Sequence, residues 1–318
     1  MAKFAERANK AARALSTTTT EYTDAALIYY QQGLSDAEVE ERTNATVKMA
    51  NVTGESAQAV SDQMTAIWNN FYDGSKSLEY YADVITELGA ATASSTDEIS
   101  AGLEKFASVA DTVGLSYEYA TSALATVTSE TRQSADVVGT AFKTLFARIQ
   151  DLELGETLED GTTMGKYSEA LNAVGINIKD SNGALKDMDD ILDEMGSKWG
   201  TLNKDQQVAL AQTVAGVRQY TQLVALMDNW GTFQENLNTA RTSEGALQEQ
   251  ADIYEESWKA ASDRVKAALE SIYSDLINDE FFIDLLNALE KVLGIADNLI
   301  DSFGGLGGLI ANLGAIFT

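Results

Sequence analysis

The stretch SADVVGTAFKTLFARIQDL, residues 134–152, decides the fold class. Its apolar residues recur every three or four positions, which is the spacing of one face of an α-helix. They are Val138, Ala141, Phe142, Leu145, Phe146, Ile149 and Leu152. Lys143 and Arg148 lie off this stripe. The pattern predicts a helix that packs its apolar face against a core.

The same spacing continues along most of the 318 residues, and glycines rather than prolines interrupt it. The chain contains no proline, although average usage of about 5% predicts roughly sixteen. Ser35-x-x-Glu38 and Ser95-x-x-Glu98 have the pattern of capping boxes, which begin helices. Further helices are predicted over residues 188–199, 204–215 and 218–230. These features predict an all-α, multi-helix fold.

One segment departs from the helical pattern. In INIKDSNGALKD, apolar residues alternate with polar ones on either side of the Asn182-Gly183 turn signal. The sequence therefore predicts a small β-hairpin near residues 176–186, too short to change the fold class.

The strongest periodicity lies in residues 243–277, for which we predict one long, coiled-coil-like helix. Its seam alternates four-residue and three-residue steps, and its members are Leu247, Ala251, Tyr254, Trp258, Ala261, Val265, Ala268 and Ile272. Two interpretations remain open. The helix either lies on the core of its own domain or forms an intermolecular coiled coil.

The composition divides the chain into four parts. We expect an N-terminal helix over residues 1–34, a helical core over 35–230, a long amphipathic helix over 231–280, and an apolar, Gly-rich segment over 281–318. Similar strings, ESAQAV and QSADVV, predict two related modules in the core, at about 44–110 and 122–195.

The segment 281–318 ends in seventeen uncharged residues, SFGGLGGLIANLGAIFT, and a membrane-spanning helix takes about twenty apolar residues. We expect this segment to pack on neighbouring copies or on the domain, with contact with a membrane as the alternative. Because the sequence stops inside an apolar run, we also expect the natural protein to continue.

Charge and composition exclude several classes of function. Lys and Arg total 22 and Asp and Glu total 49, so the net charge is −27, and the chain has no histidine and no cysteine. Such an acidic protein would be repelled by phosphates, so we predict no direct nucleic-acid binding. Disulfides, thiolate or imidazole metal ligands and cysteine nucleophiles are excluded.

The remaining candidate motifs favour structural interpretations. An acidic cluster is interpreted as the solvated first turn of a helix; its members are Asp187, Asp189, Asp190, Asp193 and Glu194. The string GTTMGKY at residues 161–167 lacks the spacing of a phosphate loop, and Glu55-Ser56 lacks the rest of a lytic transglycosylase signature. We predict no catalytic, cofactor-binding or metal-binding residues, no cofactor and no enzymatic activity. The enzymatic alternative is a hydrolase with two carboxylates.

Long stretches of the chain resemble the core region of the tail tape measure proteins of bacteriophages and prophages. The similar stretches are TTTTEYTDAALIYYQQGLSDAEVEERTNATVKMANVTG (residues 17–54), SSTDEISAGLEKFASVADTVGLSYEYATSALATVTSETRQSADVVGTAFKTLFARIQDLELG (94–155) and GINIKDSNGALKDMDDILDEMGSKWGTLNKDQQVALAQTVAGVRQYTQLVALMDNW (175–230).

The resemblance implies a structural protein that acts in several copies as scaffold and ruler during assembly of the tail tube, and that leaves the tail at infection to aid DNA passage. The implied partners are other copies of the chain, the tail tube, tail-tip and tail assembly chaperone proteins, and the host membrane through residues 281–318. The implied locations are the tail lumen of the virion and, during assembly, the host cytoplasm. The alternative from another class is a helical pore-forming protein that acts through residues 281–318.

Overall fold

The computed structural model describes residues 2–276, which form fourteen α-helices. The first seven are α1 (Ala2–Ala14), α2 (Thr19–Gln31), α3 (Asp36–Thr53), α4 (Ala57–Phe71), α5 (Leu78–Ala91), α6 (Thr96–Thr112) and α7 (Tyr117–Thr131). The others are α8 (Ala135–Glu153), α9 (Met164–Ala173), α10 (Met188–Trp199), α11 (Lys204–Asp228), α12 (Trp230–Arg241), α13 (Ala246–Glu255) and α14 (Trp258–Leu276). The predicted all-α fold is confirmed.

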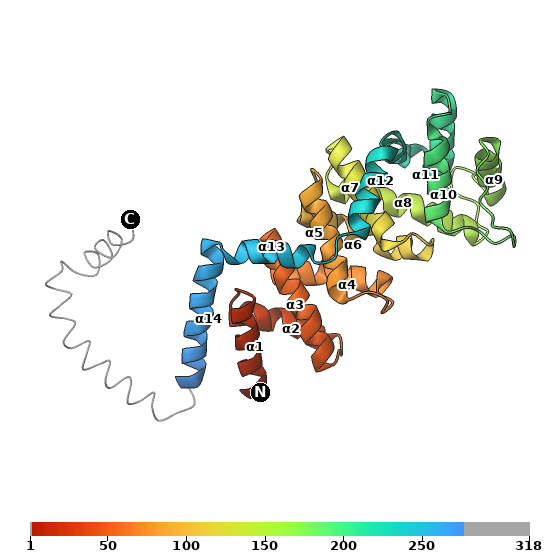
Figure 1. Ribbon diagram of the computed structural model, residues 1–318. Coiled ribbons are helices and arrows are strands. Elements are labelled where there is room, and N and C mark those ends of the chain that lie inside the picture. The colour runs from red at the N-terminus through yellow and green to blue at the C-terminus, as the bar shows by residue number, and fades with distance from the viewer. Residues whose placement is uncertain (1, 277–318) are drawn as a thin grey trace, which may run out of the picture.

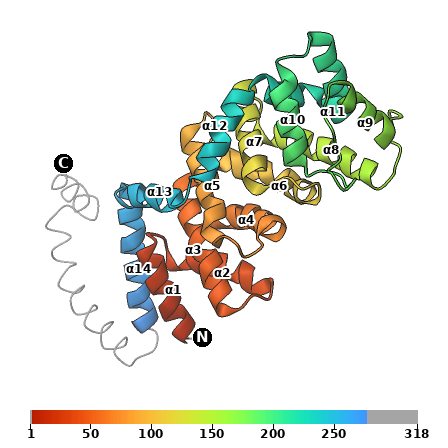
Figure 2. The same ribbon diagram turned by 45° about the vertical axis from the view of Figure 1, so that its right-hand side comes forward.

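The helices form an elongated body (Figure 1). Helices α1, α2, α3, α13 and α14 make one end, and α9, α10 and α11 make the other, with α5, α6, α7 and α12 between them (Figure 2). Helix α1 and helix α14 lie side by side, so the first and last described helices meet at one end of the molecule.

The predicted apolar stripe of residues 134–152 is buried along its whole length, as one face of α8. Helix α8 packs most closely on α6, where two glycines allow the backbones to touch. A Cβ atom added at Gly139 would lie 2.4 Å from the carbonyl oxygen of Gly102. One continuous apolar cluster runs from α2 to α13, and a small second cluster joins α1 to α2 and α3.

Helix ends follow the local sequence in most places. Helix α3 begins after Ser35, whose side chain and Glu38 form the predicted capping box, and α6 begins after Ser95. Helix α10 spans the predicted residues 188–199. The helices predicted over 204–215 and 218–230 correspond mainly to the two halves of α11, which is kinked at Gly216.

The predicted β-hairpin near residues 176–186 is wrong. Only an isolated antiparallel bridge between Lys179 and Leu185 is present there, and residues 2–276 contain no strand. The turn at Asn182-Gly183 does form, with Gly183 at a φ of 85°. Ile176 and Ile178, on one face of this segment, are buried in the main core. The Ala184 N–H donates to the Asp180 carboxylate at 2.9 Å and is thus not paired with the opposite backbone.

The prediction of one helix over residues 243–277 is also wrong. The chain breaks between α13 and α14, where Ser257 caps α14 by accepting a hydrogen bond from the Ala260 N–H at 3.1 Å. Helix α14 then turns sharply away and packs beside α1 (Figure 1). The predicted seam does not stay buried, since Val265 is 61% exposed.

Residues 1–34 contain two helices rather than the one expected. The corner between α1 and α2 includes Ser16, which is buried and has a φ of 53°. None of the helices within residues 2–276 is both long and apolar enough to cross a membrane. The apolar segment 281–318 lies outside the described residues.

Candidate functional site

A hollow of about 520 Å³ lies where the α4–α5 turn, the α6–α7 turn and the start of α10 meet. Six of its lining residues are acidic, namely Asp73, Asp111, Glu118, Asp187, Asp189 and Asp190. Lys76 is the one basic residue among them, and its ammonium group lies 4.6 Å from the centre of the Tyr80 ring. We call this feature the acidic hollow.

The start of α10 is held against the α6–α7 turn by two hydrogen bonds. The Met188 N–H donates to the carbonyl oxygen of Val113 at 3.1 Å, and the Ser116 N–H donates to the Asp189 carboxylate at 3.1 Å. Gly114 makes this approach possible, because a Cβ atom there would lie 2.6 Å from the Asp187 carboxylate and its φ is +68°. The hollow is therefore built by contacts between segments far apart in sequence.

The predicted acidic cluster does mark a helix start, since Asp187 precedes α10 and Asp189 and Asp190 lie in its first turn. The prediction that all its members are solvated is wrong for Asp189 and Glu194, which are half-buried. Burial raises the pKa of Asp189 to about 6, although the hydrogen bonds from Ser116 oppose the shift. Of the other acids in the hollow, Glu118 is also half-buried, and Asp187 and Asp190 are exposed.

Two tyrosines of the hollow donate hydrogen bonds to groups near them. The Tyr80 hydroxyl donates to the Glu118 carboxylate at 2.5 Å, and the Tyr117 hydroxyl donates to the carbonyl oxygen of Tyr81. Burial raises the pKa of Tyr80 and of Tyr117 above the ordinary value of 10.0, at which a tyrosine hydroxyl is already protonated near neutral pH. The hollow offers negative charge and hydroxyl groups, which suit contact with a cationic group.

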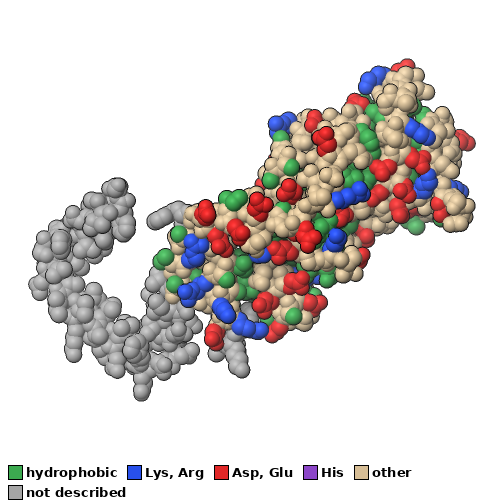
Figure 3. Space-filling view, viewed as in Figure 1, with side chains coloured by type: hydrophobic (Ala, Val, Ile, Leu, Met, Phe, Trp, Pro, Cys, Tyr) green, Lys and Arg blue, Asp and Glu red, His purple; other side chains and the backbone are tan. Residues whose placement is uncertain are grey.

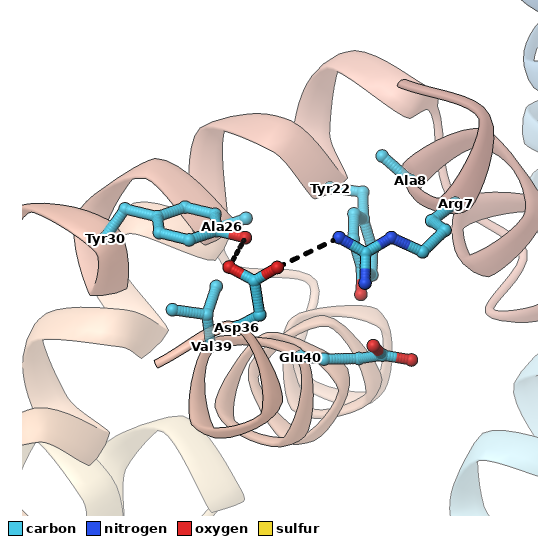
Figure 4. Close-up of a pocket in the computed structure, with 8 residues that line it drawn as sticks. All are labelled: Arg7, Ala8, Tyr22, Ala26, Tyr30, Asp36, Val39 and Glu40. Atoms are coloured by element: carbon cyan, nitrogen blue, oxygen red, sulfur yellow. Dashed lines mark hydrogen bonds and ion pairs between the residues drawn. The ribbon is translucent and has the colours of Figure 1, made fainter. Parts of the chain in front are cut away.

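A second, much smaller pocket of about 20 Å³ lies between α1, α2 and α3 (Figure 4). Asp36 stands at its centre and accepts hydrogen bonds from Arg7 and from the Tyr30 hydroxyl, both at 3.2 Å. The volume is of the order of one water molecule. This pocket is a polar joint between three helices.

A hollow of about 500 Å³ lies between α8, the loop after it and the kink of α11. Arg148 of α8 pairs with Asp160 of the loop at 2.8 Å. Its guanidinium also covers Gly216, where a Cβ atom would lie 3.0 Å from Arg148 Cζ and the φ is +78°. Arg148 thus fixes both the loop and the kink.

The other motifs found in the sequence have structural roles. In the string at 161–167, the Lys166 ammonium donates to the carbonyl oxygen of Gly161 at 2.8 Å. Ser56 caps α4, and Glu55 accepts a hydrogen bond from Gln63 at 3.2 Å. No group of three or more acidic side chains within residues 2–276 is arranged to hold a metal ion.

Asp83 is a buried residue that sequence reasoning missed. It lies on α5 and accepts hydrogen bonds from the Gly245 and Leu247 N–H groups, at 3.1 and 2.9 Å, so it caps α13. Burial raises the pKa of Asp83. The available signal was an acid within the apolar string YYADVITELG, because a charged residue on a buried face usually has a partner.

The model of one protein family, phage-related minor tail protein, matches residues 9–216, which is more than half of the chain. The chain belongs to this family. As a minor tail protein it is a structural component of the phage tail and associates with other tail components. The matched region runs from α1 to the kink of α11, so it includes the acidic hollow. No solved structure matches the chain.

Proposed function

We propose that this minor tail protein is a tail tape measure protein. In this role several copies act as a scaffold and ruler for assembly of the tail tube and leave the tail at infection ahead of the DNA. The observation that carries the proposal is the family match over residues 9–216. It coincides with the stretches of residues 17–230 that resemble tape measure proteins.

The fold and the charge support the proposal. The described residues are helical over most of their length, which agrees with the mostly helical structure that the resemblance to tape measure proteins implies. The net charge of −27 repels DNA in the same lumen, and acidic side chains are spread widely over the face seen in Figure 3.

The proposal includes the partners and places that the resemblance implies. The protein contacts other copies, the tail tube, tail-tip proteins and tail assembly chaperones, in the host cytoplasm before it enters the tail lumen. It has no enzymatic activity, and residues 281–318 contact the host membrane on ejection.

Tail length measured by electron microscopy tests the ruler role. We would insert a 60-residue helical segment after Leu276, which leaves the described helices unchanged. Tails should lengthen uniformly by roughly 90 Å, at about 1.5 Å per residue. A Gly/Ser-rich insertion of equal length is the matched control, because a flexible chain has no fixed rise.

Three outcomes would contradict the proposal, two of them on tail length and one on the place of the protein. One is an unchanged tail length when purified particles contain the protein with its helical insertion. Another is the formation of tails of normal, uniform length by phage that lack the gene. Antibody labelling of the protein on the outer surface of intact tails would contradict its place in the lumen.

A further inference from the structure

Helix α14 makes polar contacts with α1 and with the corner between α1 and α2. The Asn9 side chain donates to the carbonyl oxygen of Ala267 at 2.9 Å. The Arg264 guanidinium donates to the Ser16 hydroxyl at 2.7 Å and to the carbonyl oxygen of Glu255 at 3.1 Å. The Glu270 carboxylate accepts a hydrogen bond from the Thr19 N–H at 2.6 Å. We call the contacts of Arg264 and Glu270 with the α1–α2 corner the clasp.

Among the α14 side chains that the structure describes, the buried ones are Ala260, Asp263 and Ala267, and an alanine buries little surface. The Asp263 carboxylate is paired with Lys266 at 2.8 Å and Lys259 at 3.6 Å, both on α14 itself. Between residues 259 and 268, the docked face of α14 thus consists of two alanines and one paired carboxylate.

The break between α13 and α14 is not forced by a helix-breaking residue. Residues 246–276 contain neither glycine nor proline, and Glu256 retains right-handed helical angles, with φ −77° and ψ −9°. Ser257 is the residue that caps the new helix. A continuous helix over residues 246–276 is therefore accessible once α14 leaves α1.

When α14 is docked on α1, part of the predicted seam of residues 247–272 stays exposed to solvent. Leu247 and Ala251 are buried where α13 packs on α3 and α5, whereas Val265 is 61% exposed and Ala261 and Ala268 are partly exposed. In a continuous helix the later members would extend the same face beyond the domain. Each copy carries the same seam, and the apolar residues of such a seam pack between those of a facing helix. The seams of two copies can therefore pair with each other.

Charge favours a second copy at this helix. Residues 258–276 contain three basic residues, Lys259, Arg264 and Lys266, and three acidic ones, Asp263, Glu270 and Asp275, so their net charge is zero. The whole chain carries −27. Helix α14 is thus a surface at which two copies meet with little repulsion.

We propose that α14 is a hinged self-association element. Released from the clasp, α14 continues α13 as one helix, roughly 45 Å long at 1.5 Å per residue, and pairs through the seam with the same helix of a second copy. The inference deepens the proposed function, because it names the surface through which copies meet and the contact that keeps them apart.

The first test measures self-association of the full chain by sedimentation equilibrium. The release variant, Arg264→Ala with Glu270→Ala, removes the clasp and leaves the seam unchanged. We expect its dimer dissociation constant to fall at least tenfold below that of the unmodified chain. Arg7→Ala is the matched control, since it removes a contact of α1 that does not involve α14. Adding Val265→Glu to the release variant should abolish the gain.

A second test measures the hinge directly and remains informative if the release variant fails to fold. Spin labels at Glu249→Cys and Lys266→Cys are specific, because the chain has no cysteine. In a continuous helix these positions lie roughly 26 Å apart, and the bent form gives a shorter distance. Ser257→Ala, which removes the α14 cap while keeping the clasp, should also raise the population near 26 Å.

The proposal is overturned if both the release variant and Ser257→Ala retain the short distance and the self-association of the unmodified chain. It is also overturned if the release variant associates equally well with Val265→Glu, because association would then occur elsewhere. Neither test measures tail length, so these results and those of the insertion experiment are independent.

Discussion

Arg132 and Gly54 occupy equivalent positions in two helix corners that are built alike. The strings are Thr-Gly-Glu-Ser at 53–56, between α3 and α4, and Thr-Arg-Gln-Ser at 131–134, between α7 and α8. In each, the threonine hydroxyl accepts a hydrogen bond from the N–H two residues later, at 3.2 and 3.3 Å. The residue that follows the threonine adopts the left-handed backbone conformation, with a φ of 77° at Gly54 and 58° at Arg132.

This comparison predicts opposite effects of two substitutions. Arg132→Gly should raise the free energy of unfolding by about 0.5–1 kcal/mol, because glycine adopts the left-handed region without steric cost. Gly54→Ala should lower it by about 1 kcal/mol; the space around Gly54 is open, so the effect would be confined to the backbone. Urea unfolding measures both, and a loss of stability in Arg132→Gly would contradict the prediction.

Asp189 gives a prediction that depends on pH. Its pKa in the folded state is raised to about 6, from an ordinary value of 3.8. The stabilisation from the protonated form is complete below pH 4 and is lost as the pH rises through 6. Asp189→Asn should therefore be more stable than the unmodified chain at pH 7 by about 1–2 kcal/mol, a value reduced by solvent screening, and equally stable at pH 4.

Thermal or urea unfolding at the two pH values checks this expectation. Asp190→Asn removes a charge from the same helical turn at an exposed position and controls for the general loss of one carboxylate. If the advantage of Asp189→Asn were the same at pH 4 and pH 7, the burial of this carboxylate would have no effect on stability.

At the scale of helices, the crossing of α6 and α8 depends on Gly102 and Gly139. Gly139→Ala would place its methyl group 2.4 Å from a backbone oxygen, so the helices must move apart. We expect a loss of about 2–3 kcal/mol in the free energy of unfolding.

Gly231→Ala is the control, because Gly231 lies in α12 with open space around it. The free energy of unfolding of Gly231→Ala should rise by about 0.5–1 kcal/mol, because alanine has a higher helix propensity than glycine. Urea unfolding of the two variants would contradict the prediction if both changed stability in the same direction.

The sequence predicted the elements whose signals are local. The stripe of α8 and the cap at Ser35 depend on residues three or four positions apart, and both are found as predicted. The break before Ser257 was missed because it depends on contacts with α1, more than 240 residues away in the chain, as between Arg264 and Ser16. The hairpin failed because the Ala184 N–H pairs with the Asp180 carboxylate instead of the opposite backbone, so that only the bridge between Lys179 and Leu185 forms.

The candidate site could be predicted only in part, for the same reason. The acids at 187–194 were interpreted as a helix start, which α10 confirms. Their convergence with the α6–α7 turn depends on the contact between Ser116 and Asp189, 73 residues apart. The cap that Asp83 gives to α13 spans more than 160 residues, and periodicity carries no information on such pairs.

For the whole molecule, charge is the dominant electrostatic property. A net charge of −27 opposes the compact state through self-repulsion, and ion pairs with exposed partners, such as that between Arg7 and Asp36, offset little of it. Salt should therefore stabilise the fold, since the screening length is about 10 Å at 0.1 M.

We expect the melting temperature to rise by roughly 2–4 °C between low and moderate sodium chloride, which corresponds to about 1 kcal/mol for a chain of this size. Calorimetry or circular dichroism measures it. Chloride is preferred to sulfate, because sulfate also strengthens the burial of apolar surface. A melting temperature that fell with salt would show that attractive pairs outweigh the repulsion.

The pairing of α1 with α14 determines how the molecule responds to force. The contacts Asn9 to Ala267 and Arg264 to Ser16 show that the two helices run antiparallel. Residues 2 and 276 are therefore at the same end of the pair (Figure 1). Tension applied between residues 2 and 276 would separate the two helices from that end, so that their contacts are loaded one after another. The pair would open at low force, while the helices behind it carried no load.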